Sequence, residues 1–175
     1  MKRYIIPIVL ALLCFGTLSR CEKDDICAEG TATTPKMVID FYEYLNPSVR
    51  KNFKKIEIIE IDSPNRVLVF ENANKILLPL RTDSSQSNYI FKLTYININT
   101  EVTNEDLIEI RYTKDDLYLS RACGYISNFT LESSEPLHPN PDVTDYGNDE
   151  LWIKEYIVRQ SVITNENETH LDILF

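Results

Sequence analysis

Glycine and histidine are both scarce in this chain. Of its 175 residues, only four are glycines and two are histidines. The phosphate-binding loops of nucleotide-binding proteins need glycines at fixed spacings, and no such spacing occurs here. A zinc site needs four ligands, whereas His138 and His170 lie far apart in the sequence. No serine lies in a nucleophile-elbow pattern. The sequence therefore predicts no catalytic residue, no metal site and no cofactor.

Positive charge is also in short supply. The chain has 18 Lys and Arg residues against 27 Asp and Glu residues, which gives a net charge of −9. Residues 1–20 hold three of the basic residues and no acid, so the chain without them has a net charge near −12. Nucleic acid phosphates and anionic lipid headgroups repel such a surface. The composition excludes nucleic acid as a partner.

A hydrophobic run long enough to span a bilayer is missing as well. The apolar stretch after Lys2 and Arg3 runs from Ile5 to Phe15, about a dozen residues, whereas a membrane-spanning helix needs about 20. Pro7 within the stretch further disfavours a stable helix. Residues 1–20 are therefore interpreted as a signal peptide.

Two routes of signal-peptide cleavage remain open. Leu18 and Ser19, followed by Cys21, resemble the lipobox of bacterial lipoproteins, in which the cysteine is acylated and becomes the new N-terminus. Arg20 departs from that pattern, because the lipobox has a small residue at this position. The alternative is ordinary signal-peptidase cleavage after Ser19. The residues that follow favour lipidation at Cys21.

A short charged run comes directly after this cysteine. Lys23, Asp24 and Asp25 resemble the export signal that sends lipoproteins of Bacteroidetes to the outer face of the outer membrane. The same composition is also ordinary for a solvated tether. We therefore expect residues 21–35 to be a lipid-anchored tether. The protein is expected to be an outer-membrane lipoprotein, either surface-exposed or facing the periplasm.

Four cysteines reduce to two that can pair. Cys14 leaves with the signal peptide and Cys21 carries the lipid, which leaves Cys27 and Cys123 in an oxidising compartment. A disulfide between them is favoured over a zinc pair or a reactive thiol. It would fasten the tether to a strand in the middle of the domain.

Residues 36–175 have the pattern of a single β-rich domain. Short segments repeat Val, Ile, Tyr and Phe at period two, and Asn, Asp, Ser and Pro separate them. Nine or ten such strands without a convincing amphipathic helix predict an all-β antiparallel β-sandwich with Greek-key connections.

Two local features of this pattern carry specific predictions. Residues 107–113 and 116–123 are predicted to form a hairpin that turns at Lys114 and Asp115. Leu151 to Val162 fits either a helix or a strand, and its β-branched residues favour a strand.

Three segments together resemble an uncharacterised lipoprotein family of Bacteroidetes, a domain of unknown function. The segments are Cys21–Glu29 with Thr33–Pro35 and Asp40–Tyr42, then Tyr118–Tyr125, and finally Thr164–His170. The resemblance implies a lipoprotein with a β-rich domain, and it supplies no reaction or ligand. It also implies that Cys27 and Cys123 belong together, since each lies inside a family motif.

Two further clusters are candidates for binding. Arg121 is placed on the same strand face as Cys123, where it could pair with Glu22, Asp24, Asp25 or Glu29, or contact a partner. A structural salt bridge is favoured over a partner contact as the role of Arg121. The acidic loop around Asp142, Asp145, Asp149 and Glu150 could hold calcium, but its spacing does not fit an EF-hand, so a solvated loop is favoured.

Two functions from different classes remain. The favoured one is a non-enzymatic binding module at the outer membrane, anchored by its lipid, with an outer-membrane protein or a glycan as partner. The alternative is a small extracytoplasmic hydrolase that acts on glycans with two carboxylates. A pair of buried carboxylates in a cleft would favour the hydrolase, and exposed tyrosines gathered in one strip would favour glycan binding.

Overall fold

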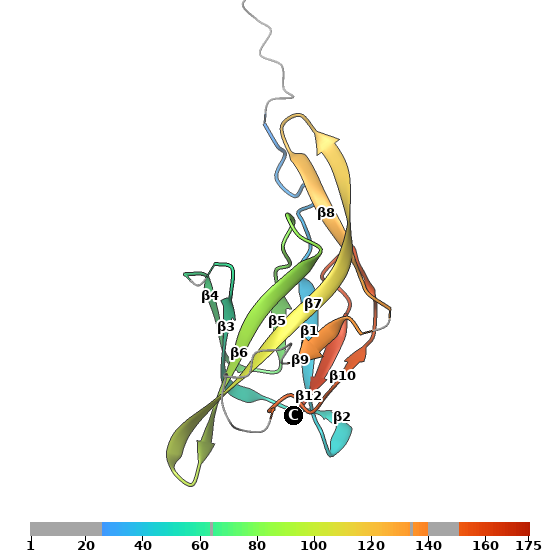
Figure 1. Cartoon of the computed structure of the whole chain (residues 1–175). Coiled ribbons are helices and arrows are strands. Elements are labelled where there is room, and N and C mark those ends of the chain that lie inside the picture. Colours follow the sequence, from blue (N-terminus) through green and yellow to red (C-terminus); the bar gives the residue numbers. More distant parts are fainter. Residues whose placement is uncertain (1–25, 64, 134, 140–150) are drawn as a thin grey trace, which may run out of the picture. The chain divides into compact units, whose positions relative to one another are not determined.

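The computed structural model describes residues 26–63, 65–133, 135–139 and 151–175, and every regular element in these ranges is a β-strand (Figure 1). No helix in these ranges is long and apolar enough to cross a membrane. The absence of helix among the described residues agrees with the all-β class that the period-two pattern predicts.

The chain forms two compact units. The described residues of the smaller unit are 26–32 and Tyr118–Tyr125. The larger unit contains Thr33–Leu117 and Ile126–Phe175, and it therefore holds most of the region predicted to be the β-sandwich.

The first sheet of the larger unit has five strands. Their order is β10-β12-β1-β2, and β5 also pairs with β1. Three of the pairs are antiparallel as expected, but β1 runs parallel to β12, with Ile39 opposite Leu171. The bounds are β1 (Met37–Glu43), β2 (Asn46–Arg50), β5 (Lys75–Leu78), β10 (Glu155–Val158) and β12 (Leu171–Leu174).

The second sheet has seven strands. Their order is β11-β8-β7-β6-β3-β4, and β9 pairs with β7. The longest ladder joins β6 to β7 over twelve register pairs, from Gln86↔Arg111 to Asn97↔Thr100. The bounds are β3 (Phe53–Glu60), β4 (Val67–Ala73), β6 (Gln86–Asn97), β7 (Thr100–Ser120), β8 (Gly124–Leu131), β9 (Leu137–Pro139) and β11 (Val162–Ile163).

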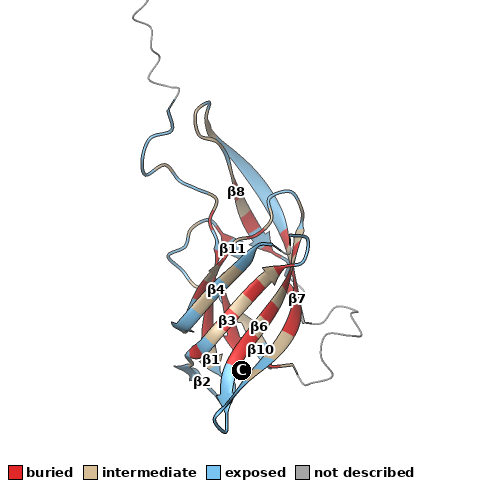
Figure 2. Cartoon of the chain, turned by 90° about the vertical axis from the view of Figure 1, so that its left-hand side faces the viewer, coloured by how far each residue is buried: buried red, intermediate tan, exposed pale blue. Residues whose placement is uncertain are grey.

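The core lies between the two sheets. Successive side chains of a strand point to opposite faces, so β1 contributes Ile39 and Phe41, β3 contributes Ile56 and Ile58, and β6 contributes Phe91. Figure 2 shows the resulting alternation of buried and half-buried residues along β3 and β6. The all-β sandwich is therefore confirmed.

The predicted hairpin at Lys114 and Asp115 is wrong. Both residues lie inside β7, which continues to Ser120. The chain turns at residues 121–123, and Gly124 follows with a φ of 70°. A tight hairpin turn needs residues that accept a positive φ. Gly124 does so readily, whereas Lys and Asp do so less well.

The structure has more strands than the nine or ten expected. The segment 151–164 divides into β10 and β11, and the region after Leu131 contains the short β9. The helical alternative for Leu151 to Val162 is wrong, because its regular residues belong to the strands β10 and, at Val162, β11. Trp152 and Ile153 precede β10 in irregular backbone, and both are buried.

Candidate functional site

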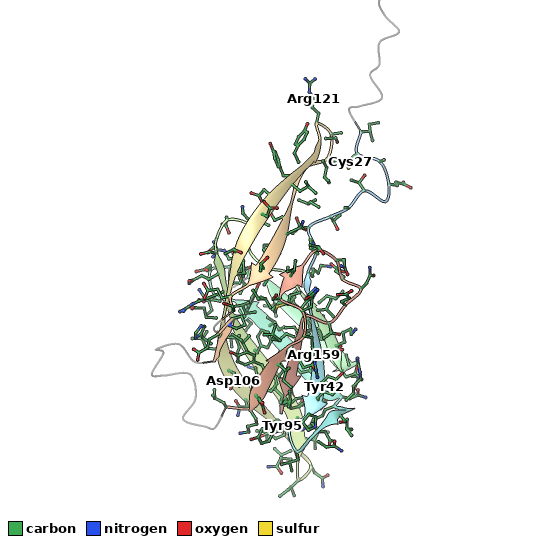
Figure 3. The ribbon with its side chains drawn as sticks, turned by 90° about the vertical axis from the view of Figure 1, so that its right-hand side faces the viewer. Cys27, Tyr42, Tyr95, Asp106, Arg121 and Arg159 are labelled. Carbon is green, nitrogen blue, oxygen red and sulfur yellow. A yellow bond between two sulfur atoms is a disulfide. The ribbon has the colours of Figure 1, made fainter. Side chains whose placement is uncertain are left out.

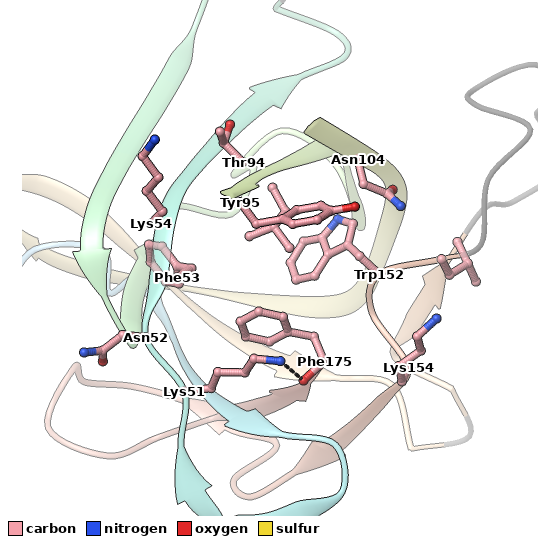
Figure 4. A pocket seen from close by; sticks show the side chains of 12 residues that line it. Lys51, Asn52, Phe53, Lys54, Thr94, Tyr95, Asn104, Trp152, Lys154 and Phe175 are labelled. Atoms are coloured by element: carbon pink, nitrogen blue, oxygen red, sulfur yellow. Dashed lines mark hydrogen bonds between the residues drawn. The ribbon is translucent and has the colours of Figure 1, made fainter. Parts of the chain in front are cut away.

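The larger unit contains a pocket of about 590 Å³ (Figure 4). Its wall comes from segments that are distant in the sequence: the residues before β3 and the start of β3, the second half of β6, one residue of β7, the segment before β10, and the residue after β12. The lining residues are Lys51, Asn52, Phe53, Lys54, Leu93, Thr94, Tyr95, Asn104, Leu151, Trp152, Lys154 and Phe175.

The apolar part of the pocket is a rigid aromatic cluster. The rings of Trp152 and Phe175 meet edge to face with centroids 5.5 Å apart, and Phe41 stacks behind Trp152 at 6.5 Å. The indole Nε1 of Trp152 donates a hydrogen bond to the carbonyl oxygen of Phe91 at 3.1 Å. Trp152 is only 6% exposed. The ring is therefore held in place before any ligand arrives, which lowers the entropic cost of binding.

Tyr95 supplies the accessible aromatic surface of the pocket. It lies near the end of β6 and is 39% exposed, and Figure 4 shows its side chain on the same hollow as Trp152. A tyrosine in this position offers an apolar ring face together with a hydroxyl group that can donate or accept a hydrogen bond.

A buried carboxylate holds the wall that carries Trp152. Asp106 on β7 accepts hydrogen bonds from the main-chain N–H groups of Trp152 (3.4 Å) and Ile153 (2.9 Å). Its side chain is 1% exposed. Irregular backbone leaves such N–H groups without ladder partners. Asp106 therefore satisfies two donors and fixes the segment that enters β10.

Positive charge gathers around this pocket although the chain as a whole is acidic. Lys51 Nζ donates to the main-chain oxygen of Phe175 at 2.7 Å and lies 4.2 Å from the centroid of its ring. Lys54 forms a 3.1 Å salt bridge with Glu101, and both side chains are exposed, so water weakens this pair. Lys154 is the third lysine. Among the described residues that line the pocket, none is acidic.

The structure contains a neighbouring pair of buried carboxylates, but this pair does not line the pocket of Figure 4 as a hydrolase would require. Asp40 on β1 and Asp172 on β12 are register partners in the parallel ladder, on the face opposite the core. Arg50 and Lys75 approach Asp40 at 2.6 Å and 3.5 Å. Arg159 approaches Asp172 at 2.6 Å, and this contact raises the pKa of the guanidinium.

These contacts indicate a structural network. Each carboxylate already has a cationic partner, and neither lines the pocket of Figure 4. A glycosidase needs carboxyl groups that can reach the scissile bond. The network instead joins β1 to β12 on the face where Figure 3 labels Tyr42 and Arg159.

The two histidines lie outside the pocket. His170 is buried, and its Nδ1 accepts a hydrogen bond from the main-chain N–H of Val38 at 2.8 Å. Burial lowers the pKa of His170, while Glu166 and Glu168 partly offset this effect. His170 therefore helps to connect β12 to β1 as a neutral side chain. His138 on β9 lies 3.8 Å from Glu135.

The smaller unit contains the predicted disulfide. Cys27 and Cys123 are bonded, with their Cα atoms 4.9 Å apart. Arg121 is not on a strand as predicted, since residues 121–123 form the turn after β7. It is exposed, and Figure 3 shows its side chain at the end of the hairpin. Within the described residues it forms no salt bridge with Glu29.

Other predicted positions lie outside the described residues. They are the lipidation site Cys21, the export residues Lys23, Asp24 and Asp25, and the acidic loop residues Asp142, Asp145, Asp149 and Glu150. In the described ranges, no group of three or more His, Cys, Asp or Glu side chains could hold a metal ion.

Sequence reasoning missed the pocket. Tyr95 and Lys51 belong to segments whose alternation only indicates strands, and nothing local shows that they meet. Trp152 was the available signal, because it is the single tryptophan of the chain and lies two residues before Lys154. The neighbouring apolar residues Leu151 and Ile153 do not alternate with it as they would in an exposed strand.

Residues 55–175 match the family model described as a family of unknown function (DUF6452), and the chain belongs to this family. The match covers most of the larger unit and Cys123, and it begins after Cys27 and Lys51. No curated protein and no solved structure shows a significant match to the chain.

Proposed function

We propose that this chain is a lipid-anchored envelope protein whose larger unit binds an acidic glycan in the pocket of Figure 4. The observation that carries the proposal is the lining itself: three lysines and an accessible tyrosine surround a rigid tryptophan, and no described lining residue is acidic. This arrangement occurs in a chain whose net charge is −9.

The chemistry of the lining matches a sugar ring that carries a carboxylate. One face of a sugar ring consists of C–H groups, and these pack against the flat faces of aromatic rings. Tyr95 offers such a face. A lysine ammonium group forms a charge-assisted hydrogen bond with a carboxylate, and Lys54 at the rim can exchange its solvent-weakened pair with Glu101 for the carboxylate of the ligand.

The size of the pocket supports the same class of ligand. A volume of about 590 Å³ falls in the usual range for small-ligand sites, about 300–1,000 Å³. One or two sugar residues fill such a space. A protein partner would need a larger contact, because stable interfaces bury about 800 Å² on each side.

Binding of oligosaccharides to purified protein tests the pocket. We expect an acidic oligosaccharide to bind and its neutral analogue to bind more weakly. Tyr95→Ala and Lys54→Gln should each reduce the affinity about tenfold, which corresponds to about 1.4 kcal/mol. Tyr125→Ala and Lys92→Gln are matched controls, because neither residue lines the pocket. Equal affinity in all four variants would contradict the proposal.

The same samples test the hydrolase alternative. Cleavage of the oligosaccharide that disappears in a folded Asp40→Asn or Asp172→Asn variant would favour the enzyme. Binding without cleavage favours the binding module.

The envelope location rests on the N-terminal sequence, and the bonded Cys27 and Cys123 are in keeping with an oxidising compartment. We expect Cys21→Ala to release the protein from the membrane fraction and to abolish labelling by a fatty-acid analogue. Unchanged labelling, or a mature N-terminus at Arg20, would contradict lipidation.

Surface display is a separate part of the proposal. Protease added to intact cells should digest the domain, and replacement of Lys23, Asp24 and Asp25 by alanine should protect it. Equal protection of both forms would place the domain on the periplasmic side.

A further inference from the structure

The smaller unit is short, and three of its apolar or aromatic side chains are exposed to solvent. Ile26 is 83% exposed, Tyr118 is 51% exposed and Tyr125 is 68% exposed. The two tyrosine rings lie across the end of the β7–β8 hairpin, with centroids 5.1 Å apart. An isolated exposed apolar residue is ordinary, whereas the neighbouring rings of Tyr118 and Tyr125 form one continuous exposed aromatic surface.

The disulfide keeps this hairpin end close to the proposed lipid. Cys21 and Cys27 are six residues apart, so their Cα atoms can be separated by at most about 22 Å in a fully extended chain. The Cα of Cys123 lies only 4.9 Å from that of Cys27. Since acyl chains on Cys21 would lie in the bilayer, the turn after β7 stays within a short distance of the headgroups.

The side chains of the hairpin end suit a membrane interface. Tyrosine is enriched where apolar and aqueous regions meet, because its ring is apolar and its hydroxyl group is polar. Arg121 is exposed in the same turn, and its guanidinium can donate paired hydrogen bonds to a phosphate group. Among the described residues of the unit, Arg121 and Glu29 are the charged ones, so the unit itself is not repelled by headgroups.

We propose that the end of the β7–β8 hairpin, with Tyr118, Arg121 and Tyr125, contacts the lipid headgroups of the membrane in which Cys21 is anchored, together with Ile26, which precedes the bonded Cys27. This inference rests on the proposed lipidation. The acyl anchor confines the hairpin near the bilayer and makes the contact effectively intramolecular, so a weak interaction is sufficient. The net charge near −12 of the chain without residues 1–20 opposes binding of the free protein to anionic lipid, but it does not oppose an apolar contact with a neutral interface.

Quenching by brominated lipids tests this contact in the processed, lipidated protein, which begins at Cys21. The protein is reconstituted in phosphatidylcholine vesicles with bromine near the headgroup end of the acyl chains. The probe is Tyr125→Trp, and Tyr44→Trp is the matched control, because Tyr44 is also exposed but belongs to the larger unit. Trp152 is present in both proteins and contributes equally.

We expect brominated lipid to reduce the emission of the Tyr125→Trp protein more than that of the control. Adding Cys27→Ser and Cys123→Ser should restore the emission of the probe. A second combination, Ile26→Ser with Tyr118→Ser, keeps the disulfide and should also restore it. Quenching equal to that of the control, or quenching that neither combination changes, would overturn the proposal. A hairpin that binds a protein partner instead of lipid predicts no quenching beyond that of the control.

Flotation of the same vesicles separates the two possible failures. Protein that floats with the vesicles but shows no quenching contradicts the headgroup contact alone. Protein that does not float contradicts lipidation at Cys21, and the inference then fails with it. Glycan binding in the pocket is measured independently and is affected by neither result.

Discussion

At the scale of single residues, the turn between β6 and β7 has a backbone conformation that suits one of its two residues poorly. Ile98 and Asn99 join β6 to β7, and both have positive φ values, 44° and 65°. A β-branched residue in this left-handed region is unusual, because its side chain crowds the backbone. Ile98 is also 91% exposed. Its presence therefore costs stability and returns no packing.

We expect Ile98→Asn to stabilise the protein by about 1 kcal/mol, since asparagine accepts the left-handed conformation that the turn requires. Denaturant melts measure this change. Ile96→Asn is the control, because Ile96 is exposed but lies on β6 outside the turn. A gain of equal size in both variants would mean that removal of surface apolarity, rather than relief of strain, is responsible.

His170 predicts how stability depends on pH. Burial holds its pKa below the ordinary value, so the unfolded state binds the proton more readily than the folded state. Stability should therefore fall as pH drops below about 6.5, and it should level off below the folded pKa. Each unit of pKa difference adds about 1.4 kcal/mol to the loss.

Denaturant melts between pH 7.5 and pH 5 check this prediction. His170→Gln should weaken the pH dependence in that window. An unchanged slope in His170→Gln would show that other groups cause the acid sensitivity.

At the scale of elements, irregular segments position the candidate site and regular strands position the core. Period-two alternation predicted β3 and β6 well, because each strand has one face in the core and one face toward solvent. The same pattern failed at Lys114 and Asp115, where β7 continues with exposed residues on both faces. Local polarity looks the same in a turn and in a strand that leaves the core.

The segment before β10 is the element on which the pocket depends most. Asp106→Ala would leave the buried N–H groups of Trp152 and Ile153 without their acceptor, at a cost of about 1–3 kcal/mol. We expect a loss of stability in denaturant melts and weaker glycan binding. Asp106→Asn keeps one acceptor oxygen and should lose less of both. Full binding in a folded Asp106→Ala protein would contradict the positioning role.

The disulfide links two segments that lie 96 residues apart in the sequence. Removing a native disulfide typically costs about 2–4 kcal/mol in the chain-entropy model. The double substitution Cys27→Ala with Cys123→Ala should therefore lower the midpoint of denaturant unfolding. Melts of the parent protein with and without reductant provide the comparison, and identical curves would show that the bridge does not stabilise the fold.

At the scale of the whole molecule, pairings between distant segments determine what sequence reasoning could find. The all-β sandwich followed from composition and alternation, and the bonding of Cys27 to Cys123 followed from the number of cysteines. The parallel pair of β1 and β12 could not be inferred, because its ladder joins the two ends of the larger unit. The pocket could not be inferred from the sequence either, because Tyr95, Trp152 and Phe175 come together only when both sheets have formed.

The single tryptophan offers the most direct test of the central claim, that the pocket binds an acidic glycan. Trp152 is the only indole in the chain and lines the pocket, so its Nε1–H resonance and its fluorescence report on that site alone. Titration with an acidic oligosaccharide should shift the indole resonance in a saturable manner, and Lys54→Gln should weaken the response. An indole signal that stays unchanged at saturating oligosaccharide would contradict the account.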